Sequence, residues 1–326
     1  MIKDSFGRIH DYLRLSLTDN CNFRCFYCMP EEDYDFTPAS RLMQPNEILA
    51  LAKVFVEQGV KKIRLTGGEP LVRKDAAEII AALGQLPVEL VITTNGSRIH
   101  ELLPTLLAAN IQTINISLDT LNAAKFFKIT RRDLFPQVRN NIDLLLQSGI
   151  KVKINVVLMK GYNDDEILDF LAWTNQADLE VRFIEFMPFD GNKWTSNQVF
   201  SLEEILKVAE TRYEVFPVEG APHDTAKHFM IPGHKGSFAV ISTMTAPFCS
   251  TCNRMRLTAD GKLKNCLFSA EETDLLSALR RGEEVLPLIY ANILDKKKAL
   301  GGQFSTDFEK IETSALHNRS MITIGG

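Results

Sequence analysis

Three cysteines fall within eight positions in the stretch Cys21-Asn22-Phe23-Arg24-Cys25-Phe26-Tyr27-Cys28. The stretch follows residues 12–18, in which apolar and polar residues alternate with the period of a β-strand. Iron–sulfur clusters are held by cysteine thiolates, usually by four of them. A group of only three therefore predicts a cluster in which one iron stays open to another ligand, and an open iron implies chemistry.

Three other interpretations of this triplet compete with a cluster. Cysteines at these spacings would share one face of a helix as an apolar stripe, but the polar residues 19–20 and Pro30 favour a loop. Structural zinc needs a fourth ligand, for which His10 and His100 are the nearest histidines. A disulfide framework does not fit a long chain with only six cysteines and no secretory signal.

The chain around the triplet alternates short β-branched runs with longer helical ones, which is the pattern of successive βα units around a parallel sheet. We expect six strands, at residues 12–18, 62–66, 89–93, 113–118, 151–157 and 180–186. Helical segments lie between them, for example 45–58, which begins with a proline, and 135–148, which Gly149 ends.

The alternation within these strands predicts a polar interior. In the first strand Leu13, Leu15 and Leu17 share one face, and the polar residues between them take the other. Helices that cover a parallel sheet need an apolar outer face, so the polar side chains must point inward. The inward set contains four cations: Arg14, Arg64, Lys153 and Arg182.

Charges of one sign inside a fold need an explanation, because removing an unpaired charge from water costs several kcal/mol. The four cations either pair internally, with Glu69, Glu89 or Asp119 as partners, or line a wet cavity that receives an anion. Four like-signed groups from four different strands favour the cavity.

Ligands in parallel βα folds gather at the carboxyl ends of the strands. After the second strand comes Thr66-Gly67-Gly68-Glu69-Pro70, where paired glycines permit close backbone approach and Glu69 can accept from an ammonium group. By itself this sequence also reads as an ordinary turn. Other strand-end segments are 93–96, 117–119 and 185–188.

A second cysteine triplet lies far downstream, at Cys249, Cys252 and Cys266. Zinc is the alternative here, with His234 as a fourth ligand, because Cys-x-x-Cys is a common zinc half-site. A triplet that matches the first favours a second cluster. The intervening Arg254-Met255-Arg256 places two guanidinium groups on one strand face, where they would bind phosphate or a purine edge unless that face is merely solvated.

Composition and length set outer limits on fold and function. The chain has 326 residues and a net charge of −4, which argues against nucleic acid or a membrane surface as the main partner. No apolar run approaches the length needed to span a bilayer, and we expect a soluble, cytoplasmic protein. The predicted fold class is α/β: a partial (βα)6 TIM-like barrel with a polar lumen in residues 1–190, and a smaller α+β extension with the second cluster in residues 191–326.

The CxxxCxxC spacing after a strand, with Tyr27 before the last cysteine, resembles the radical S-adenosylmethionine superfamily. Within it, the two triplets, the Arg-x-Arg and the terminal Gly325-Gly326 resemble the GTP 3′,8-cyclase family of molybdenum cofactor biosynthesis nearly end to end. Two departures stand out: residues 213–235 carry no family motif, and Asn141 stands where glycine is expected.

The resemblance implies a ligand set. The first triplet would hold a [4Fe–4S] cluster that binds S-adenosylmethionine, and the second triplet another [4Fe–4S] cluster that meets the guanine. Contacts to S-adenosylmethionine would come from Tyr27, Gly67, Gly68, Glu69, Ser117, Asn155 and Met187. GTP would be bound by Arg14, Arg64, Thr93, Lys153, Arg182, Arg254, Met255 and Arg256.

The resemblance also implies the reaction and the partners. A 5′-deoxyadenosyl radical would abstract the ribose 3′ hydrogen of GTP, and the sugar radical would attack C8 of guanine. Expected partners are an external one-electron reductant such as flavodoxin or ferredoxin and the cyclic pyranopterin monophosphate synthase that takes the product; a homodimer is compatible with the sequence. A radical peptide-modifying enzyme would carry more C-terminal cysteines, and an iron–sulfur or zinc scaffold would not need the inward cations.

The last two residues, Gly325-Gly326, follow an apolar, β-prone segment at 321–324. Terminal glycines are often disordered. Two residues without side chains could also enter a narrow channel and present a carboxylate to the lumenal arginines. We therefore expect Gly325 and Gly326 to act in catalysis together with Arg14, Arg254 and Arg256.

Overall fold

The structure is a computed structural model that describes residues 1–29, 34–304, 307–311, 313 and 316–325. All six predicted strands are present, with ends shifted by at most two residues for β1 (Tyr12–Ser16), β2 (Lys62–Thr66), β3 (Glu89–Thr94), β4 (Thr113–Ser117), β5 (Lys151–Leu158) and β6 (Leu179–Glu185). These strands are parallel and pair in chain order, which confirms the partial barrel.

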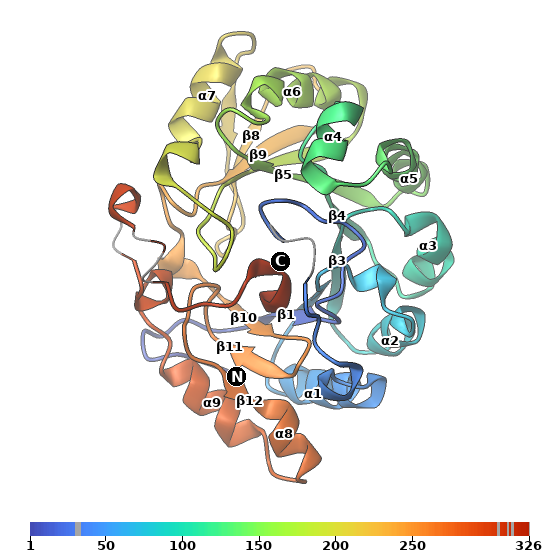
Figure 1. Cartoon of the computed structure of the whole chain (residues 1–326), viewed down its shortest axis with the longest axis vertical. Helices are drawn as coiled ribbons and strands as arrows, with labels where there is room; N and C mark the ends of the chain where they lie inside the picture. The colour runs from blue at the N-terminus through green and yellow to red at the C-terminus, as the bar shows by residue number, and fades with distance from the viewer. Residues whose placement is uncertain (30–33, 305–306, 312, 314–315, 326) are drawn as a thin grey trace.

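The helices between these strands lie on the outside of the ring (Figure 1). They are α1 (Pro45–Glu57), α2 (Ala76–Leu83), α3 (Ile99–Ala108), α4 (Ala123–Thr130), α5 (Phe135–Gln147) and α6 (Ile167–Gln176). Local sequence sets their starts: Gln44 and Glu47 form a capping box around Pro45, and the Asn122 side chain accepts from the backbone N–H groups of Ala124 and Lys125.

Strand parity holds as predicted. Leu13, Leu15 and Leu17 are fully buried in the core between sheet and helices. The inward face carries arginines in register on neighbouring strands, with Arg14 opposite Arg64 on one side and Arg256 on the other. Cross-strand neighbours of like charge repel one another, so this register needs an anion or a wet space to be stable.

Strands from the second half of the chain extend both edges of this sheet. One edge continues from β6 through β9 (Ser237–Ile241), β8 (Lys227–Met230) and β7 (Phe216–Val218). The other edge continues from β1 through β10 (Arg254–Leu257), β11 (Lys262–Lys264) and β12 (Thr273–Asp274). The twelve strands therefore form one sheet, and the division near residue 190 stays a prediction.

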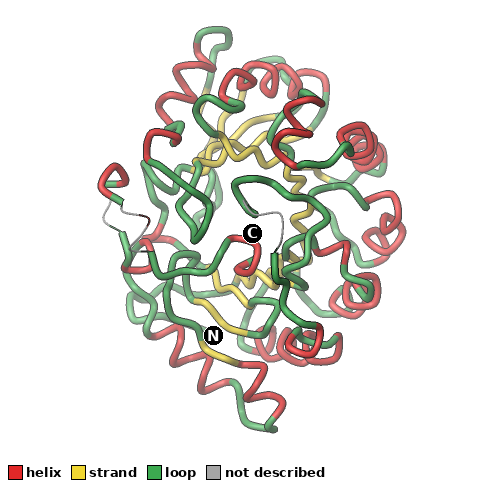
Figure 2. The backbone as a smooth tube through the Cα atoms, viewed as in Figure 1, coloured by secondary structure: helices red, strands yellow, loops and turns green. Residues whose placement is uncertain are grey.

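The remaining helices are α7 (Leu202–Glu210), α8 (Leu275–Arg280), α9 (Leu286–Leu294) and α10 (Met321–Ile324). α10 lies inside the ring, well away from the outer helices (Figures 1 and 2). The β-prone sequence of this segment thus forms a short helix, and Gly326 is outside the described residues.

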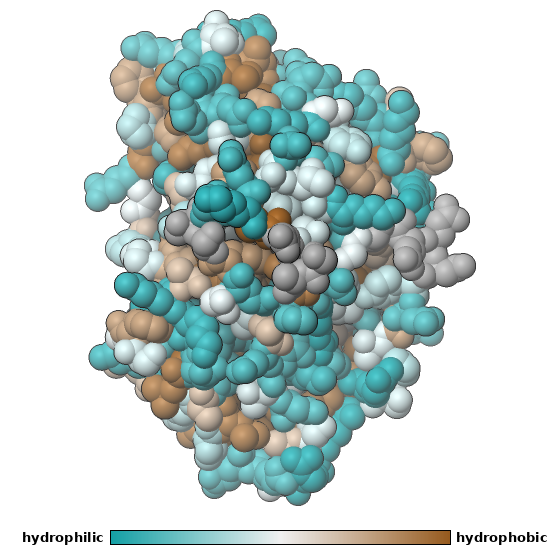
Figure 3. Space-filling view, turned by 60° about the vertical axis from the view of Figure 1, so that its left-hand side comes forward, coloured by the Kyte–Doolittle hydropathy of each residue, from teal (hydrophilic) through white to brown (hydrophobic). Residues whose placement is uncertain are grey.

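The outer surface mixes hydrophilic and hydrophobic residues, with hydrophilic ones widespread on the face in Figure 3. No helix in the described part of the chain has the length and apolar character needed to cross a membrane.

Candidate active site

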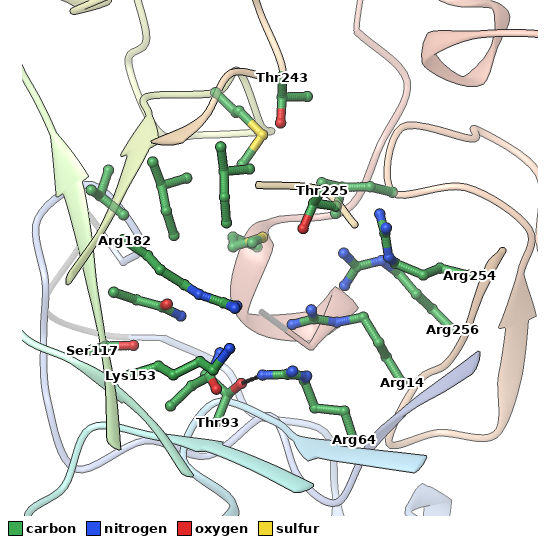
Figure 4. A pocket seen from close by; sticks show the side chains of 18 of the residues that line it. Arg14, Arg64, Thr93, Ser117, Lys153, Arg182, Thr225, Thr243, Arg254 and Arg256 are labelled. Carbon is green, nitrogen blue, oxygen red and sulfur yellow. Dashed lines mark hydrogen bonds between the residues drawn. The ribbon is translucent and has the colours of Figure 1, made fainter. Parts of the chain in front are cut away.

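A cavity of about 610 Å³ occupies the ring, and all six cysteines line it. The triplets come from sequence positions more than 200 residues apart, yet they share this one chamber because β10 pairs with β1. Eight lysines and arginines also line the cavity. Figure 4 shows six of them reaching toward a common space: Arg14, Arg64, Lys153, Arg182, Arg254 and Arg256.

The first triplet occupies the loop after β1. The Phe23 N–H and the Asn95 amide donate toward Cys21 Sγ, over 3.4 Å and 3.9 Å. Burial raises the pKa of the Cys21 and Cys28 thiols to about 12, so the thiols themselves have little tendency to ionise here. Coordinated cations would supply the missing stabilisation of the thiolates.

Gly67 and Gly68 bring the loop after β2 against the cysteine loop. A Cβ at Gly67 would lie 2.5 Å from the Thr18 carbonyl oxygen, and one at Gly68 would lie 2.5 Å from that of Asn20. The Gly68 and Glu69 N–H groups donate to these same two carbonyls, at 2.7 Å and 2.8 Å. Glycine is therefore required for this close contact, and both glycines line the cavity.

Glu69 takes a different place from the one expected. Its carboxylate is buried, does not line the cavity, and accepts hydrogen bonds from Leu71 N, Thr94 Oγ1 and Asn95 N. Burial raises the pKa of Glu69 to about 7. The geometry supports a carboxylate that ties the β2 and β3 ends together, and it gives no support to the expected contact with a cofactor ammonium group.

Tyr27, Ser117, Asn155 and Met187 all line the cavity, as expected for cofactor contacts. The Tyr27 hydroxyl donates to Asp119 Oδ2 at 2.6 Å. In the described chain the Oδ1 atom of Asn155 is buried without a hydrogen-bond partner. A buried unpartnered acceptor at a cavity wall fits a ligand that carries donors, as S-adenosylmethionine does.

Asp119, the last residue of the predicted strand-end segment 117–119, also lines this wall. Its other oxygen accepts from the Val157 N–H at 2.9 Å, and burial raises the pKa of Asp119 to about 6. Of the two roles that the sequence allows Asp119, the structure supports a place at the strand end, since within the described residues its side chain accepts hydrogen bonds from Tyr27 and Val157 and not from the inward cations.

The second triplet has an electropositive setting. Lys296 Nζ donates to Cys252 Sγ at 3.7 Å, and the Leu300 N–H donates to Cys249 Sγ at 3.4 Å. Burial would raise the pKa of Cys252, but the charges of Lys296 and Arg254 lower it. Sequence patterns did not single out Lys296, because it lies 30 residues after Cys266 and outside any motif.

The zinc alternatives find no support. His234 Nδ1 lies 2.8 Å from Thr174 Oγ1, and His234 does not line the cavity that holds the second triplet. His10 bonds Asp4 instead of the first triplet. Across the described residues, no three His, Cys, Asp or Glu side chains converge closely enough to hold a single metal ion.

The inward cations do not pair with the acids proposed for them. Glu89 binds Lys62 at 2.8 Å and Asp119 binds Tyr27, whereas Arg64 donates to the Tyr12 hydroxyl and to Thr93 Oγ1 at 3.1 Å. Burial, together with neighbouring positive charge, lowers the pKa of Arg14 and brings that of Arg256 to about 10. Lys153 and Arg182 do pair internally, but with Glu180. The positive charge that this one carboxylate leaves on the wall favours an anion in the cavity.

Met255 and Gly325, two further residues expected in the site, lie in different surroundings. Met255 is fully buried in the core and does not line the cavity, because it alternates with Arg254 and Arg256 along β10. Gly325 does not line the cavity either, but it contacts a residue that does: its carbonyl accepts from Arg256 Nη1 at 2.7 Å. A Cβ at Gly325 would lie 2.8 Å from Ser16 Cβ, and the residue has a φ of +86°.

Comparisons with known proteins agree with this architecture. The family model for the Radical SAM superfamily matches residues 15–174, and the model for Molybdenum Cofactor Synthesis C matches residues 179–301. The structure resembles that of Streptococcus suis SuiB bound to S-adenosylmethionine, with a TM-score of 0.62 over 97% of this chain and 78% of that chain. At 14% identity, this likeness shows the fold alone.

Several relatives match over nearly the whole chain. GTP 3′,8-cyclase of Listeria monocytogenes is 41% identical, over 91% of this chain and 91% of that protein, and the mitochondrial GTP 3′,8-cyclase of Arabidopsis thaliana is 45% identical, over 100% and 84%. Molybdenum cofactor biosynthesis protein 1 of Homo sapiens is 47% identical, over 99% of this chain but only 51% of that protein. The chain spans about half the length of such animal relatives. By sequence, the chain belongs to the radical SAM superfamily and, within it, to the GTP 3′,8-cyclase family of molybdenum cofactor biosynthesis.

Proposed function

We propose that this chain converts GTP into 3′,8-cyclo-7,8-dihydro-GTP, the first step of molybdenum cofactor biosynthesis. One observation carries the proposal: two cysteine triplets and six inward cations line the same cavity. Relatives named GTP 3′,8-cyclase support it. No observation favours a peptide substrate.

In this proposal each triplet holds a [4Fe–4S] cluster. Membership of the superfamily implies the cluster on Cys21, Cys25 and Cys28 together with S-adenosylmethionine. The N–H···S contacts to Cys249 and Cys252 and the positive charge of Lys296 support the second cluster. Held by Cys21, Cys25 and Cys28, the first cluster would, together with S-adenosylmethionine, supply the radical chemistry that abstraction of the 3′ hydrogen of GTP and bond formation to C8 require.

The chain's own residues bind and orient the nucleotide. Cations from β1, β2, β5, β6 and β10 surround the chamber and would hold the triphosphate, as charge-assisted contacts are strong in a buried site. Arg256 also holds the Gly325 carbonyl, which fixes the tail against the wall of the chamber. Placement of this kind lowers a barrier by fixing reacting atoms close together.

The proposed partners follow from the chemistry. Each turnover would need two electrons, one to cleave S-adenosylmethionine and one, taken up with a proton, to convert the cyclised nucleotide radical into the 7,8-dihydro product. We assign both to an external reductant of the flavodoxin or ferredoxin class. The cyclised product would pass to the cyclic pyranopterin monophosphate synthase.

The test is anaerobic reconstitution with iron and sulfide, followed by incubation with GTP, S-adenosylmethionine and dithionite. Mass spectrometry should show 5′-deoxyadenosine and an isomer of GTP. In that isomer the 3′ carbon of the sugar no longer carries a hydrogen. Deuterium at the 3′ position should appear in 5′-deoxyadenosine. Cleavage of S-adenosylmethionine with unchanged GTP would contradict the proposal.

A further inference from the structure

Residues 219–226 connect β7 to β8, within the segment that sequence motifs left unexplained. Four residues of this loop line the cavity: Ala221, His223, Asp224 and Thr225. Figure 4 shows the Thr225 side chain facing the same space as Arg14, Arg254 and Arg256. The loop is therefore a wall of the chamber as well as a connection between strands.

The loop contacts both sides of the open ring. His223 Nδ1 lies 3.0 Å from the Thr251 carbonyl, and Arg254 Nη2 donates to the His223 carbonyl at 2.8 Å, so the loop reaches the side that holds the second triplet. Its strands belong to the opposite edge of the sheet, beyond β6 and β9. The loop thus bridges the gap in the barrel.

His228, at the start of β8, anchors the other side of the loop. Its Nε2 lies 2.8 Å from Asp224 Oδ2, and its Nδ1 lies 3.2 Å from Glu180 Oε2. The loop passes close over the imidazole, since a Cβ at Gly220 would lie 3.2 Å from His228 Cδ2. The strand register explains how the His228 ring reaches Glu180 on β6. Ala239 lies between Arg182 and His228 on neighbouring strands, and its small side chain leaves room for the ring.

Glu180 connects His228 to two of the inward cations. Its Oε1 lies 3.2 Å from Lys153 Nζ and also bonds Arg182 Nε. All these side chains are largely buried, with 8% of Glu180 and 14% of His228 exposed. Bonds to Asp224 and Glu180 raise the pKa of His228 to about 9, so the imidazole is protonated at neutral pH.

The contact between His228 and Glu180 sets the net charge of this group. Glu180 orients Lys153 and Arg182 but cancels part of their positive charge. With protonated His228, the group holds three cations and two carboxylates and keeps one net positive charge. Without it the group is neutral, and a polyanion loses an attraction that a dry cavity makes strong.

We propose that His228 is a positioning residue for the phosphates of the nucleotide: it fixes the 219–226 loop as the wall that closes the chamber, and it keeps the Lys153–Arg182 pair oriented and net positive. The inference rests on the proposed function, since it takes the nucleotide to be GTP. His228 acts through Glu180 and need not touch the substrate.

The experiment compares His228→Gln with His234→Gln in the reconstituted chain. His234 is a matched control, because it is a histidine of the same region that bonds Thr174 outside the cavity. Calorimetric titration with GTP and with guanosine measures the preference for phosphates. We expect His228→Gln to weaken GTP binding about tenfold and leave guanosine binding unchanged. His228→Lys, which keeps a cation there, should recover most of the loss, and His234→Gln should match the wild type.

Other outcomes separate the two proposals. Wild-type affinity for GTP in folded His228→Gln would overturn the inference, and so would an equal loss for GTP and guanosine. Thermal unfolding verifies that each variant is folded, and failure of His228→Lys to recover GTP binding would also contradict it. Absence of GTP binding by the wild type would instead overturn the proposed function.

Discussion

The two cysteine triplets line one cavity but are built in different ways. The first lies within a single loop of eight residues, and burial raises the pKa of its Cys21 and Cys28 thiols, as it does for Cys249 in the second triplet. The second joins two segments and is surrounded by distant basic groups: Lys296 donates to Cys252 Sγ, and Arg8 Nη1 donates to the Cys249 carbonyl at 2.7 Å. The first site is thus encoded locally, whereas the second depends on the assembled fold.

This difference suggests different tasks. Around the first triplet, acids and amide groups such as Asp119 and Asn155 suit a zwitterionic cofactor. Around the second, Arg254 and Arg256 suit an anionic substrate. Variants at either triplet should therefore separate cleavage of the cofactor from conversion of the nucleotide.

The largest effect is expected at the first triplet. Replacing Cys21, Cys25 and Cys28 with Ala should abolish both 5′-deoxyadenosine and cyclised product, because no site remains for the cluster that activates S-adenosylmethionine. Liquid chromatography of both products checks this. Residual 5′-deoxyadenosine above the level of protein-free controls would show that the task is assigned to the wrong triplet.

Replacing Cys249, Cys252 and Cys266 with Ala should separate the two activities. We expect cyclised product to disappear while dithionite still drives uncoupled cleavage of S-adenosylmethionine, since the first loop does not rely on these residues. The same two products are quantified. If both vanish in a folded variant, the triplets are not separable and the comparison fails.

The sequence predicts the locally encoded features of the molecule, and it does not predict those that depend on the assembled fold. The first loop, the six strands and the inward cations could be predicted because each depends on local spacing or on strand parity. Lys296, Arg8 and His228 could not, since only the assembled fold brings them into contact with residues that line the cavity: Cys252, Cys249 and Asp224. For Met255, alternation on β10 turns the side chain into the core, so the expected GTP contact stays a prediction that only its backbone could make.

A smaller effect is expected from the tail beside the second triplet. Deleting Gly325-Gly326 removes the acceptor for Arg256 and should lower the yield of cyclised product about tenfold, with GTP affinity and iron content nearly unchanged. Gly325→Ala is the companion variant, because its Cβ would clash with Ser16. A free peptide with the tail sequence should restore part of the yield. Full activity of the truncated chain would show that the tail has no part in forming the cyclised product.

The smallest effect concerns the N-terminal support of the second triplet. Burial alone would raise the pKa of Asp4, but hydrogen bonds from His10 and Arg8 lower it to about 2. A lowered pKa gives stability that is present above about pH 4 and is lost as the pH falls through 2, worth about 2 kcal/mol. The unfolding free energies of wild type and Asp4→Asn, both without metal, should differ near neutral pH and converge toward pH 2. A pH-independent difference would contradict this linkage.

The central claim, that both triplets bind clusters, is tested most directly by iron and sulfide analysis of the anaerobically reconstituted chain. The account predicts about eight iron and eight sulfide per wild-type chain, and about four of each after replacement of either triplet by Ala. About four irons together with one zinc in an active wild-type sample would contradict it.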